Sequence, residues 1–369
     1  MIYLDYAATA PLRKEALDAM LPWMQECGNP DSLHAAGRRA AVALQDARDE
    51  VAAALGVKPS EVYFTSGGTE ADNWAVRMPK AAERGVLLSE IEHHAVLEAA
   101  RASRNKVTLL PVGKDGIVSP RTLERTLKDE GLVGVMAVNN ETGCIQPVLE
   151  LSEIAHARGA LFFSDCVQAA CACDLRPIAA ACDLMSVSSH KVGGPVGVGA
   201  LVVKKGVRIS PLIYGGEQER GLRGGTSNVA GAVGFARALT LATQERERFI
   251  RHTGALRDLF EQEIKKLLED KVRVDGGARV PNISHLTFAG GGGALLGLVD
   301  RGGVACSAGA ACAAHSAQPS HVMVAMGRTE KEALSGLRFS FGQRTSEQDA
   351  VTAAKIVAER YFALTGGIQ

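Results

Sequence analysis

Between residues 62 and 203 short apolar segments alternate with segments of helical spacing, and this alternation limits the folds that the chain can adopt. The apolar segments predict seven strands, at Val62–Thr65, Val86–Ser89, Val107–Pro111, Leu132–Val138, Leu161–Ser164, Leu184–Val187 and Val198–Val203. The helices expected in this region and just after it are Thr69–Met78, Ala95–Ser103, Pro120–Lys128, Leu149–Ala157 and Asn228–Gln244. Apolar strands joined through helices form a mostly parallel sheet that is covered on both faces. The predicted fold class is therefore α/β, with a seven-stranded sheet in a large domain.

The segments outside this region predict a second, smaller α+β domain. An extended arm at 1–12 precedes helices at Leu12–Met24 and Gly37–Leu55. A long charged helix begins near Glu245, and short strands are expected at Ile283–Phe288, Val304–Ala305 and Leu337–Phe341. The closing helix starts at a capping box formed by Ser346 and Asp349. We expect a large domain at 13–247 and a small domain made of 1–12 and 248–369.

Composition excludes several classes of protein. The 369 residues are 46% hydrophobic and 22% charged, with a formal net charge of zero, so no basic excess favours nucleic acid or an anionic membrane. No apolar run is long enough to span a bilayer, and the first residues lack the pattern of a signal peptide. We expect a cytoplasmic protein whose eight cysteines are reduced and do not form a structural zinc site.

Lys191 follows the predicted strand Leu184–Val187 and precedes a break at Gly193-Gly-Pro195. Open α/β sheets bind their ligands at the carboxyl ends of strands. Burial there favours the neutral amine, which can form a Schiff base with an aldehyde cofactor. A lone lysine at a strand end would more often be an ordinary surface residue.

Asp165 and Gln168 support the interpretation that Lys191 binds an aldehyde cofactor. Both follow the preceding predicted strand, Leu161–Ser164. Pyridoxal phosphate needs a carboxylate beside its ring nitrogen in addition to the lysine, and an amide suits its ring hydroxyl. A strand-terminal Asp alone would be read as a turn residue.

Two glycine-rich turns are candidates for binding a phosphate group. Gly68 and Thr69 lie where a strand passes through a glycine turn into a helix, and a helix N-terminus favours an anion. Thr69 and Glu70 are also consistent with a simple helix cap. The second turn, Gly215–Thr226, contains arginines, amides and a hydroxyl.

Three further polar residues follow or occupy predicted strands. His93 can stack on a cofactor ring or transfer protons, and Asn140 can hydrogen-bond the ring hydroxyl or the substrate. Arg338 alternates with apolar neighbours, so its guanidinium either binds a substrate carboxylate or forms an ordinary salt bridge.

These residues sit in motifs that together resemble the cysteine desulfurases of the class V aminotransferase group, nearly from end to end. The motifs are Tyr3-Leu-Asp-Tyr-Ala-Ala-Thr9, Gly28-Asn-Pro-x-Ser-Leu-His34, Phe64-Thr-Ser-Gly-Gly-Thr-Glu-Ala-Asp-Asn73, Glu92-His93, Val138-Asn-Asn-Glu141, Asp165-x-x-Gln168, Ser188-x-His-Lys191, Arg220-Gly-x-Arg-x-Gly-Thr226 and Arg338-Phe-Ser340. The resemblance implies pyridoxal 5'-phosphate as cofactor, fold type I of the enzymes that use it, and a homodimer.

The resemblance also implies a role for each site residue. Lys191 forms the Schiff base, Asp165 pairs with the pyridine nitrogen, His93 stacks on the ring, and Gln168 and Asn140 hold the side of the ring hydroxyl. The residues implied to hold the phosphate are Gly68, Thr69, Ser188 and His190, with Thr226 of the other subunit. The implied substrate residues are Arg338, Asn29 and Asn140.

The segment Gly309-Ala-Ala-Cys312 resembles the one that carries the nucleophilic cysteine in this family. By resemblance, L-cysteine becomes L-alanine through a ketimine of the cofactor, and Cys312 in a mobile loop at about 305–320 receives the sulfur as a persulfide. The spacing along the sequence from Cys312 to Pro319 resembles that of the longer-loop branch of the family. That branch passes sulfur to an acceptor protein for iron–sulfur cluster assembly or tRNA thiolation. No resident metal is implied, apart from transient iron–sulfur ligation by Cys312.

Two other functions remain open on the sequence. One is a class V aminotransferase, epimerase or lyase for another amino acid, including selenocysteine, in which Cys312 would not receive sulfur. The other is a binding or scaffold protein that has kept the fold without the cofactor, which the presence of Lys191 opposes. Cys306, a second thiol near Cys312, is interpreted as a space-filling residue.

Overall fold

The computed structural model describes residues 1–103, 105–309 and 318–366, and its largest element is a seven-stranded sheet. The strands are β2 (Val62–Thr65), β3 (Val86–Ser89), β4 (Val107–Leu110), β5 (Leu132–Gly134), β6 (Leu161–Asp165), β7 (Leu184–Ser188) and β8 (Gly199–Val203). Their order is β2-β8-β7-β6-β5-β3-β4. All pairs are parallel except those that β8 makes with β2 and β7. The predicted α/β fold with a mostly parallel sheet is confirmed.

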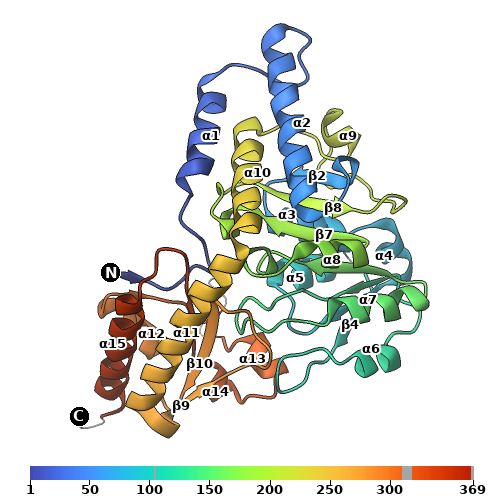
Figure 1. Ribbon diagram of the computed structural model, residues 1–369. Helices are drawn as coiled ribbons and strands as arrows, with labels where there is room; N and C mark the ends of the chain where they lie inside the picture. The colour runs from blue at the N-terminus through green and yellow to red at the C-terminus, as the bar shows by residue number, and fades with distance from the viewer. Residues whose placement is uncertain (104, 310–317, 367–369) are drawn as a thin grey trace.

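Helices cover both faces of this sheet (Figure 1). They are α2 (Ala35–Leu55), α3 (Gly68–Val76), α4 (Pro79–Arg84), α5 (His94–Ala102), α6 (Pro120–Thr126), α7 (Val148–Ala157), α8 (Leu175–Ala181) and α10 (Val229–Gln244). Adjacent strand residues enter different buried clusters: Phe162 packs with residues of α2, α7 and α10, whereas Phe163 packs with residues of α3 and α5. Because side chains alternate along a strand, this division requires an apolar layer on each side.

The remaining elements form a smaller body around a separate core. Its strands are β1 (Ile2–Tyr3), β9 (Val272–Val274), β10 (Ile283–Phe288), β11 (Val304–Ala305) and β12 (Gly336–Ser340). Its helices are α11 (Arg246–Leu268), α12 (Ala294–Arg301) and α15 (Glu347–Thr365). Helices α13 (His321–Ala325) and α14 (Glu330–Ala333) pack instead in a cluster that contains Ile91 and Met136 of the large body. Strands β12, β10 and β9 are antiparallel, and β1 pairs with β11 in parallel. Leu4 from the N-terminal arm is buried in the same cluster as Phe260 and Phe339.

Two further helices complete the structure, with short 3₁₀ turns between elements. The helices are α1 (Lys14–Gln25) and α9 (Gln218–Gly221), and the 3₁₀ turns are Pro59–Glu61, Ala169–Cys171, Ser189–Val192 and Glu269–Lys271. Figure 1 shows α10 and α11 following each other as a long rod that joins the region of α2 to that of α15. The predicted domain boundary near residue 248 lies within this rod and stays a prediction.

The strand predicted at Leu132–Val138 is too long, because β5 ends at Gly134. The Oε1 atom of Glu92 accepts a hydrogen bond of 2.7 Å from the backbone N–H of Met136, in the place where a neighbouring strand would pair. On its other side the chain keeps its bonds to β6, because the N–H groups of Val135 and Ala137 donate to the carbonyls of Phe163 and Asp165 at 3.0 and 2.8 Å, so only the pairing with β3 has ended. Within the described residues, no helix is long and apolar enough to cross a membrane.

Candidate functional site

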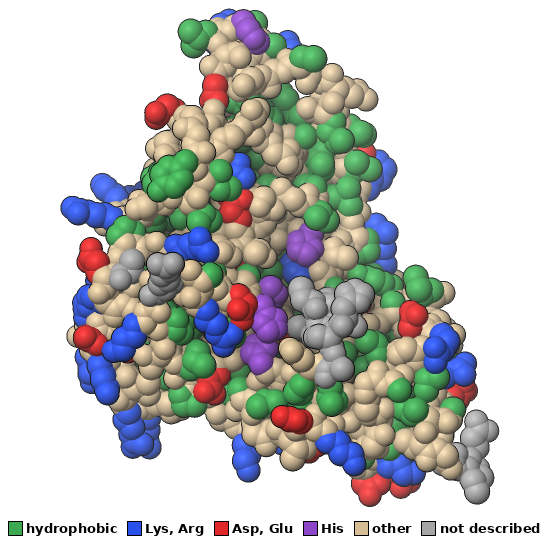
Figure 2. All heavy atoms as spheres, turned by 180° about the vertical axis from the view of Figure 1, so that it is seen from behind, with side chains coloured by type: hydrophobic (Ala, Val, Ile, Leu, Met, Phe, Trp, Pro, Cys, Tyr) green, Lys and Arg blue, Asp and Glu red, His purple; other side chains and the backbone are tan. Residues whose placement is uncertain are grey.

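The carboxyl ends of β3, β6 and β7 meet at one edge of the sheet, because these strands run in the same direction. A cavity of about 240 Å³ lies there. It is lined by Ala7, Ala8, Gly68, Thr69, Asp72, His93, Met136, Asn140, Asp165, Val167, Gln168, Ser188, His190, Lys191 and Arg338. The structure thus brings every cofactor residue expected from the sequence into one cavity, apart from Thr226. Figure 2 shows histidine side chains gathered near the middle of one face of the molecule.

Lys191 lies at one wall of this cavity, in the 3₁₀ turn that follows β7. Its Nζ atom donates hydrogen bonds to the carbonyl oxygens of Ala7 (2.6 Å) and Ala8 (2.8 Å) in the N-terminal arm. Burial, followed by the charge of Arg338, lowers the pKa of Lys191 to about 8. A substantial fraction of the amine is therefore neutral near pH 8, as a nucleophilic or proton-carrying lysine requires.

Asp165 is the last residue of β6 and is buried at the cavity floor. Its Oδ1 accepts a hydrogen bond of 2.8 Å from the N–H of Val167. Burial raises the pKa of Asp165 to about 6, while that hydrogen bond and the charge of Lys191 oppose the rise. The carboxyl group can therefore be ionised at neutral pH beside a cationic partner.

Two more buried carboxyl groups, Asp72 and Glu92, lie close to Asp165. Burial and the charge of Asp165 raise the pKa of Asp72 well above its usual range, and burial raises that of Glu92 to about 8. Each accepts a hydrogen bond from a serine, Ser186 for Asp72 and Ser89 for Glu92. Asp165 is thus the first of the three to lose its proton. The sequence interpretation missed Asp72, although it lies three residues after Thr69 on the same helix.

The end of the cavity near α3 offers hydrogen-bond donors to an anion. Helix α3 begins at Gly68, and the preceding residue, Gly67, supplies no side-chain cap, so the first N–H groups of the helix are not capped in this way. Gly68 must lack a side chain, since a Cβ there would lie 2.8 Å from Cγ2 of Val167. Ser188, at the end of β7, and His190, in the 3₁₀ turn that follows, line the same cavity.

The turn Gly215–Thr226 lies away from this cavity within the chain. Arg223 pairs with Glu70 through contacts of 3.0 and 3.1 Å, and the guanidinium of Arg220 stacks 3.9 Å from the ring centroid of Tyr63. These arginines do not line the cavity within the chain, and phosphate binding by this turn stays a prediction. Thr226 is exposed.

His93 and Gln168 flank the remaining walls. Nδ1 of His93 accepts a hydrogen bond of 3.1 Å from the N–H of Ala95 and so caps α5. Burial, followed by the charge of Lys191, lowers the pKa of His93 to about 4, so its imidazole is neutral at physiological pH. Nε2 of Gln168 donates a hydrogen bond of 2.8 Å to the carbonyl of Ala7.

Arg338 forms a salt bridge and also lines the cavity. Its position therefore agrees in part with each of the two predicted roles, a salt bridge and the binding of a substrate carboxylate. Its Nη2 lies 2.8 Å from Oδ1 of Asp5, and its Nη1 donates to the carbonyl of Asn140 at 2.7 Å. Its Nε has no hydrogen-bond partner among the described residues, although the side chain is buried. A guanidinium held from two sides in this way is preorganised for a carboxylate.

The other predicted site residues lie elsewhere. Asn29 is exposed, and its side chain accepts a hydrogen bond from the N–H of Asp31. Cys312 lies outside the described residues. Cys306 is described, and burial, followed by the charge of Asp5, raises the pKa of its thiol. This shift disfavours the thiolate, which agrees with a space-filling role for Cys306.

Comparison with known proteins gives one consistent result. The family model for class-V aminotransferases matches residues 2–352. The chain is 41% identical to "Cysteine desulfurase IscS" of Dictyoglomus turgidum, over 94% of this chain and 91% of that protein. Among solved structures, "NIFS-LIKE PROTEIN" has a TM-score of 0.89 at 34% identity and covers 97% of this chain and 98% of its own. "SspA in complex with cysteine" has a TM-score of 0.81 at 31% identity, with 94% and 100% covered.

The matches extend over nearly the whole length of this chain and of the matched proteins. The cavity residues all lie within residues 2–352, which the family model matches. This chain therefore belongs to the class-V aminotransferase family and, within it, to the cysteine desulfurases.

Proposed function

We propose that this protein converts L-cysteine to L-alanine and holds the released sulfur as a persulfide on Cys312. The sulfur then passes to an acceptor protein for iron–sulfur cluster assembly or thiolation. One observation carries this proposal: the half-buried amine of Lys191, the buried carboxyl of Asp165 and Arg338 line one cavity. The relatives of this chain are named cysteine desulfurases.

The cavity fits pyridoxal 5'-phosphate. Its groups meet the needs of that molecule one by one: a lysine amine with a lowered pKa, a buried carboxyl for the ring nitrogen, a neutral imidazole for the ring face, and an uncapped helix N-terminus for the phosphate. We infer that these are Lys191, Asp165, His93 and the Gly68–Thr69 turn, with Ser188 and His190 beside the phosphate and Gln168 and Asn140 beside the ring hydroxyl. When bound, pyridoxal phosphate supplies an electron sink for the charge that develops at the substrate Cα.

The protein's own residues would bind the substrate and carry protons. Arg338 holds the α-carboxylate, because Asp5 and the Asn140 carbonyl fix its guanidinium in the cavity wall. Lys191 takes the Cα proton and returns it, since a pKa of about 8 suits an amine that must both accept and donate near neutral pH.

Sulfur transfer then requires a thiolate at Cys312. That thiolate attacks the substrate sulfur, so an S–S bond forms while the Cβ–S bond breaks. The electron pair of the broken bond stays with the carbon skeleton, which takes up protons and leaves as alanine. Cys306 is unsuited to this step because burial disfavours its thiolate.

We propose a homodimer in which Thr226 reaches the phosphate site of the partner. Within the chain Thr226 is exposed and does not line the cavity of Lys191. Large apolar side chains near it are also exposed: Tyr214, just before the turn, is 82% exposed and Val196 is 77% exposed. Patches of this kind are typical of surfaces that another chain covers.

The test is to incubate the purified protein with L-cysteine and to measure alanine and the mass of the peptide that carries residue 312. We expect a gain of about 32 Da, one sulfur atom, on Cys312 before any reductant is added. The Cys312→Ala variant should keep the absorbance of the bound cofactor and lose both products. If this variant released alanine at the full rate, a lyase acting without persulfide formation would replace the proposal.

A further inference from the structure

The two stretches of chain that flank residues 310–317 are each hydrogen-bonded to residues at or next to the candidate site. On the N-terminal side, Ser307 and Arg338 exchange backbone hydrogen bonds of 3.1 and 2.7 Å. Ser307 Oγ also donates to the carbonyl of Gly309 at 3.2 Å. The residue that lines the cavity, Arg338, therefore also fixes the start of the stretch that contains Cys312.

On the C-terminal side, Ser320 and α13 are fastened to both bodies of the molecule. Ser320 Oγ accepts a hydrogen bond of 3.2 Å from the N–H of Met323 and so caps α13. His321 Nε2 lies 3.0 Å from the carbonyl oxygen of Glu92. After α13, Arg328 Nη2 lies 3.3 Å from Oδ1 of the buried Asp275.

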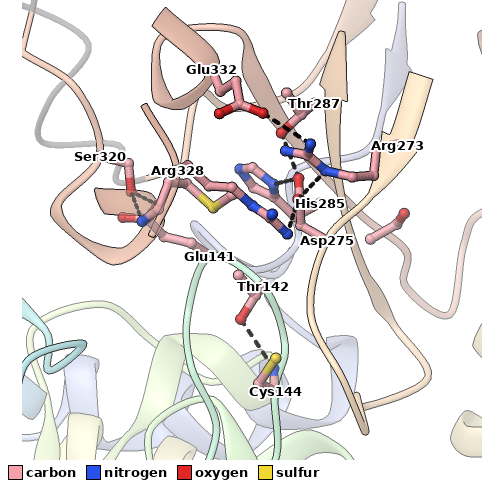
Figure 3. Close-up of polar contacts among 12 residues, drawn as sticks. Glu141, Thr142, Cys144, Arg273, Asp275, His285, Thr287, Ser320, Arg328 and Glu332 are labelled. Atoms are coloured by element: carbon pink, nitrogen blue, oxygen red, sulfur yellow. Dashed lines mark hydrogen bonds and ion pairs between the residues drawn. The ribbon is translucent and has the colours of Figure 1, made fainter. Parts of the chain in front are cut away.

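Glu141 contacts both flanking stretches at once. Figure 3 shows Ser320 directed at Glu141, and Ser320 Oγ donates a hydrogen bond to Oε2 of Glu141. The same Oε2 would lie 2.5 Å from a Cβ placed on Gly309, whose φ of +93° also favours glycine. This oxygen thus bonds Ser320 and occupies the space that a side chain at residue 309 would need, on either side of the segment that carries Cys312.

Stability alone does not explain a glutamic acid at this position. The side chain of Glu141 is fully buried, and its Oε1 has no hydrogen-bond partner among the residues that the structure describes. Burying a carboxyl oxygen that has no hydrogen-bond partner is costly, and a group that contains one is usually retained for a reason other than packing. The neighbouring residue, Asn140, accepts from Arg338 through its carbonyl, so Glu141 is joined to the substrate side of the cavity by a single peptide unit.

We infer that Glu141 is a positioning residue for sulfur transfer, acting as the shared anchor of the two stretches that flank residues 310–317. It sets where Cys312 is presented relative to the substrate, and it does not take part in binding the substrate. This inference rests on the proposed function, because it gives Cys312 the role of sulfur acceptor.

The experiment compares Glu141→Ala, Glu141→Gln and Ser320→Ala in the holoenzyme. A matched control is Ser346→Ala, since Ser346 caps α15 through the same kind of serine hydroxyl, accepting from the N–H of Asp349 at 3.1 Å, far from the cavity. Three quantities are measured: the rate of persulfide formation on residue 312, the cysteine concentration that half-saturates the change in cofactor absorbance, and the iodoacetamide alkylation rate of Cys312 in the cofactor-free protein. The exposed Cys27 is the internal reference for alkylation.

For Glu141→Ala and Ser320→Ala we expect persulfide formation to slow roughly tenfold or more, because small displacements of a reacting group are costly. The half-saturating cysteine concentration should stay within about twofold, and the ratio of Cys312 to Cys27 alkylation should change. Glu141→Gln keeps an oxygen that can accept from Ser320, so it should retain most of the rate, as should Ser346→Ala.

Persulfide formation at the wild-type rate in Glu141→Ala would overturn the inference. An equal loss in Ser346→Ala would also overturn it, because the effect would then be general. If the wild-type protein itself forms no persulfide on Cys312, the proposed function fails instead, and the two failures are therefore distinguishable.

Discussion

The amine of Lys191 lies 2.6 Å from the carbonyl oxygen of Ala7, so the lysine that follows β7 is held by the arm at the start of the chain. The same carbonyl accepts a hydrogen bond from Gln168 at 2.8 Å. Asp5, in the same arm, pairs with Arg338 from β12. The N-terminal arm therefore orients side chains from both bodies of the molecule around one cavity.

Replacing Lys191 by Met should change how stability depends on pH. The folded protein lowers the pKa of Lys191 from 10.5 to about 8, so between these values the unfolded chain binds more protons. Stability linked to this group consequently rises with pH across that window, by at most about 3 kcal/mol. Urea unfolding of the cofactor-free proteins at about pH 7.5 and about pH 9.5 measures it. Wild type should gain stability relative to Lys191→Met at the higher pH, and parallel behaviour of the two proteins would contradict the lowered pKa.

Arg338→Lys should weaken the binding of cysteine. A lysine cannot reach Asp5, the Asn140 carbonyl and a substrate carboxylate with one planar group, so we expect KM to rise about tenfold or more. Steady-state kinetics with L-cysteine provide the measurement. Arg279→Lys is the control, because Arg279 also holds a carboxylate through two nitrogens, at 2.8 and 3.3 Å from Glu261, but does not line the cavity. Equal effects of the two substitutions would argue against substrate binding by Arg338.

His93→Phe keeps a flat ring and removes the imidazole nitrogens. We expect turnover to fall about tenfold while the cofactor stays bound, because a phenyl ring can still stack on the cofactor but has no Nε2–H to donate a hydrogen bond. Because the pKa of His93 is about 4, its imidazole is neutral from about pH 6 to about pH 9, and the loss should be the same throughout that range. His156→Phe serves as the control, because it removes a partly exposed imidazole on α7 that pairs with Asp183. A loss that varies with pH, or none at all, would contradict this role.

Asp275→Asn should destabilise the protein at neutral pH by about 3 kcal/mol, because it removes the buried carboxylate that Arg273, Arg328 and His285 contact. Burial alone would raise the pKa of Asp275, but hydrogen bonds from His285 and Thr287 and the charges of His285 and Arg273 outweigh it and bring the pKa to about 2 (Figure 3). This stabilisation is present above about pH 4 and is lost as the pH falls toward about 2.

The difference in unfolding free energy between wild type and Asp275→Asn should therefore narrow in acid, as measured by urea unfolding. Asp349→Asn is the comparison, since Asp349 caps an exposed helix start through Ser346 and its loss should cost about 1 kcal/mol or less. A constant difference between pH 7 and acid would show that the Asp275 carboxyl is not held in its ionised form.

The sequence was sufficient to predict the sheet and the residues at its edge. Apolar segments that end in Ser188 or Asp165 carry their own strand signal, and parallel strands place such ends together whatever else the chain does. Lys191, Asp165 and Gln168 could therefore be assigned to one site before any contact was known. The strand predicted through Val138 was too long because the carboxyl of Glu92, 44 residues away, bonds the N–H of Met136, and local spacing carries no trace of that contact.

Only the tertiary structure determined the pKa values and the hydrogen-bond partners of these groups. The lowered pKa of Lys191 comes from burial and from Arg338, which lies far along the chain, and the raised pKa of Asp165 comes from its burial at the cavity floor. The contacts of Glu141 with Gly309 and Ser320 join residues that no periodicity relates. Hydrophobic spacing records which face of an element is buried, whereas hydrogen bonds and charges between distant segments depend on how those faces pack. The sequence by itself thus determined the fold and the chemical groups of the site, and packing decided their protonation and their partners.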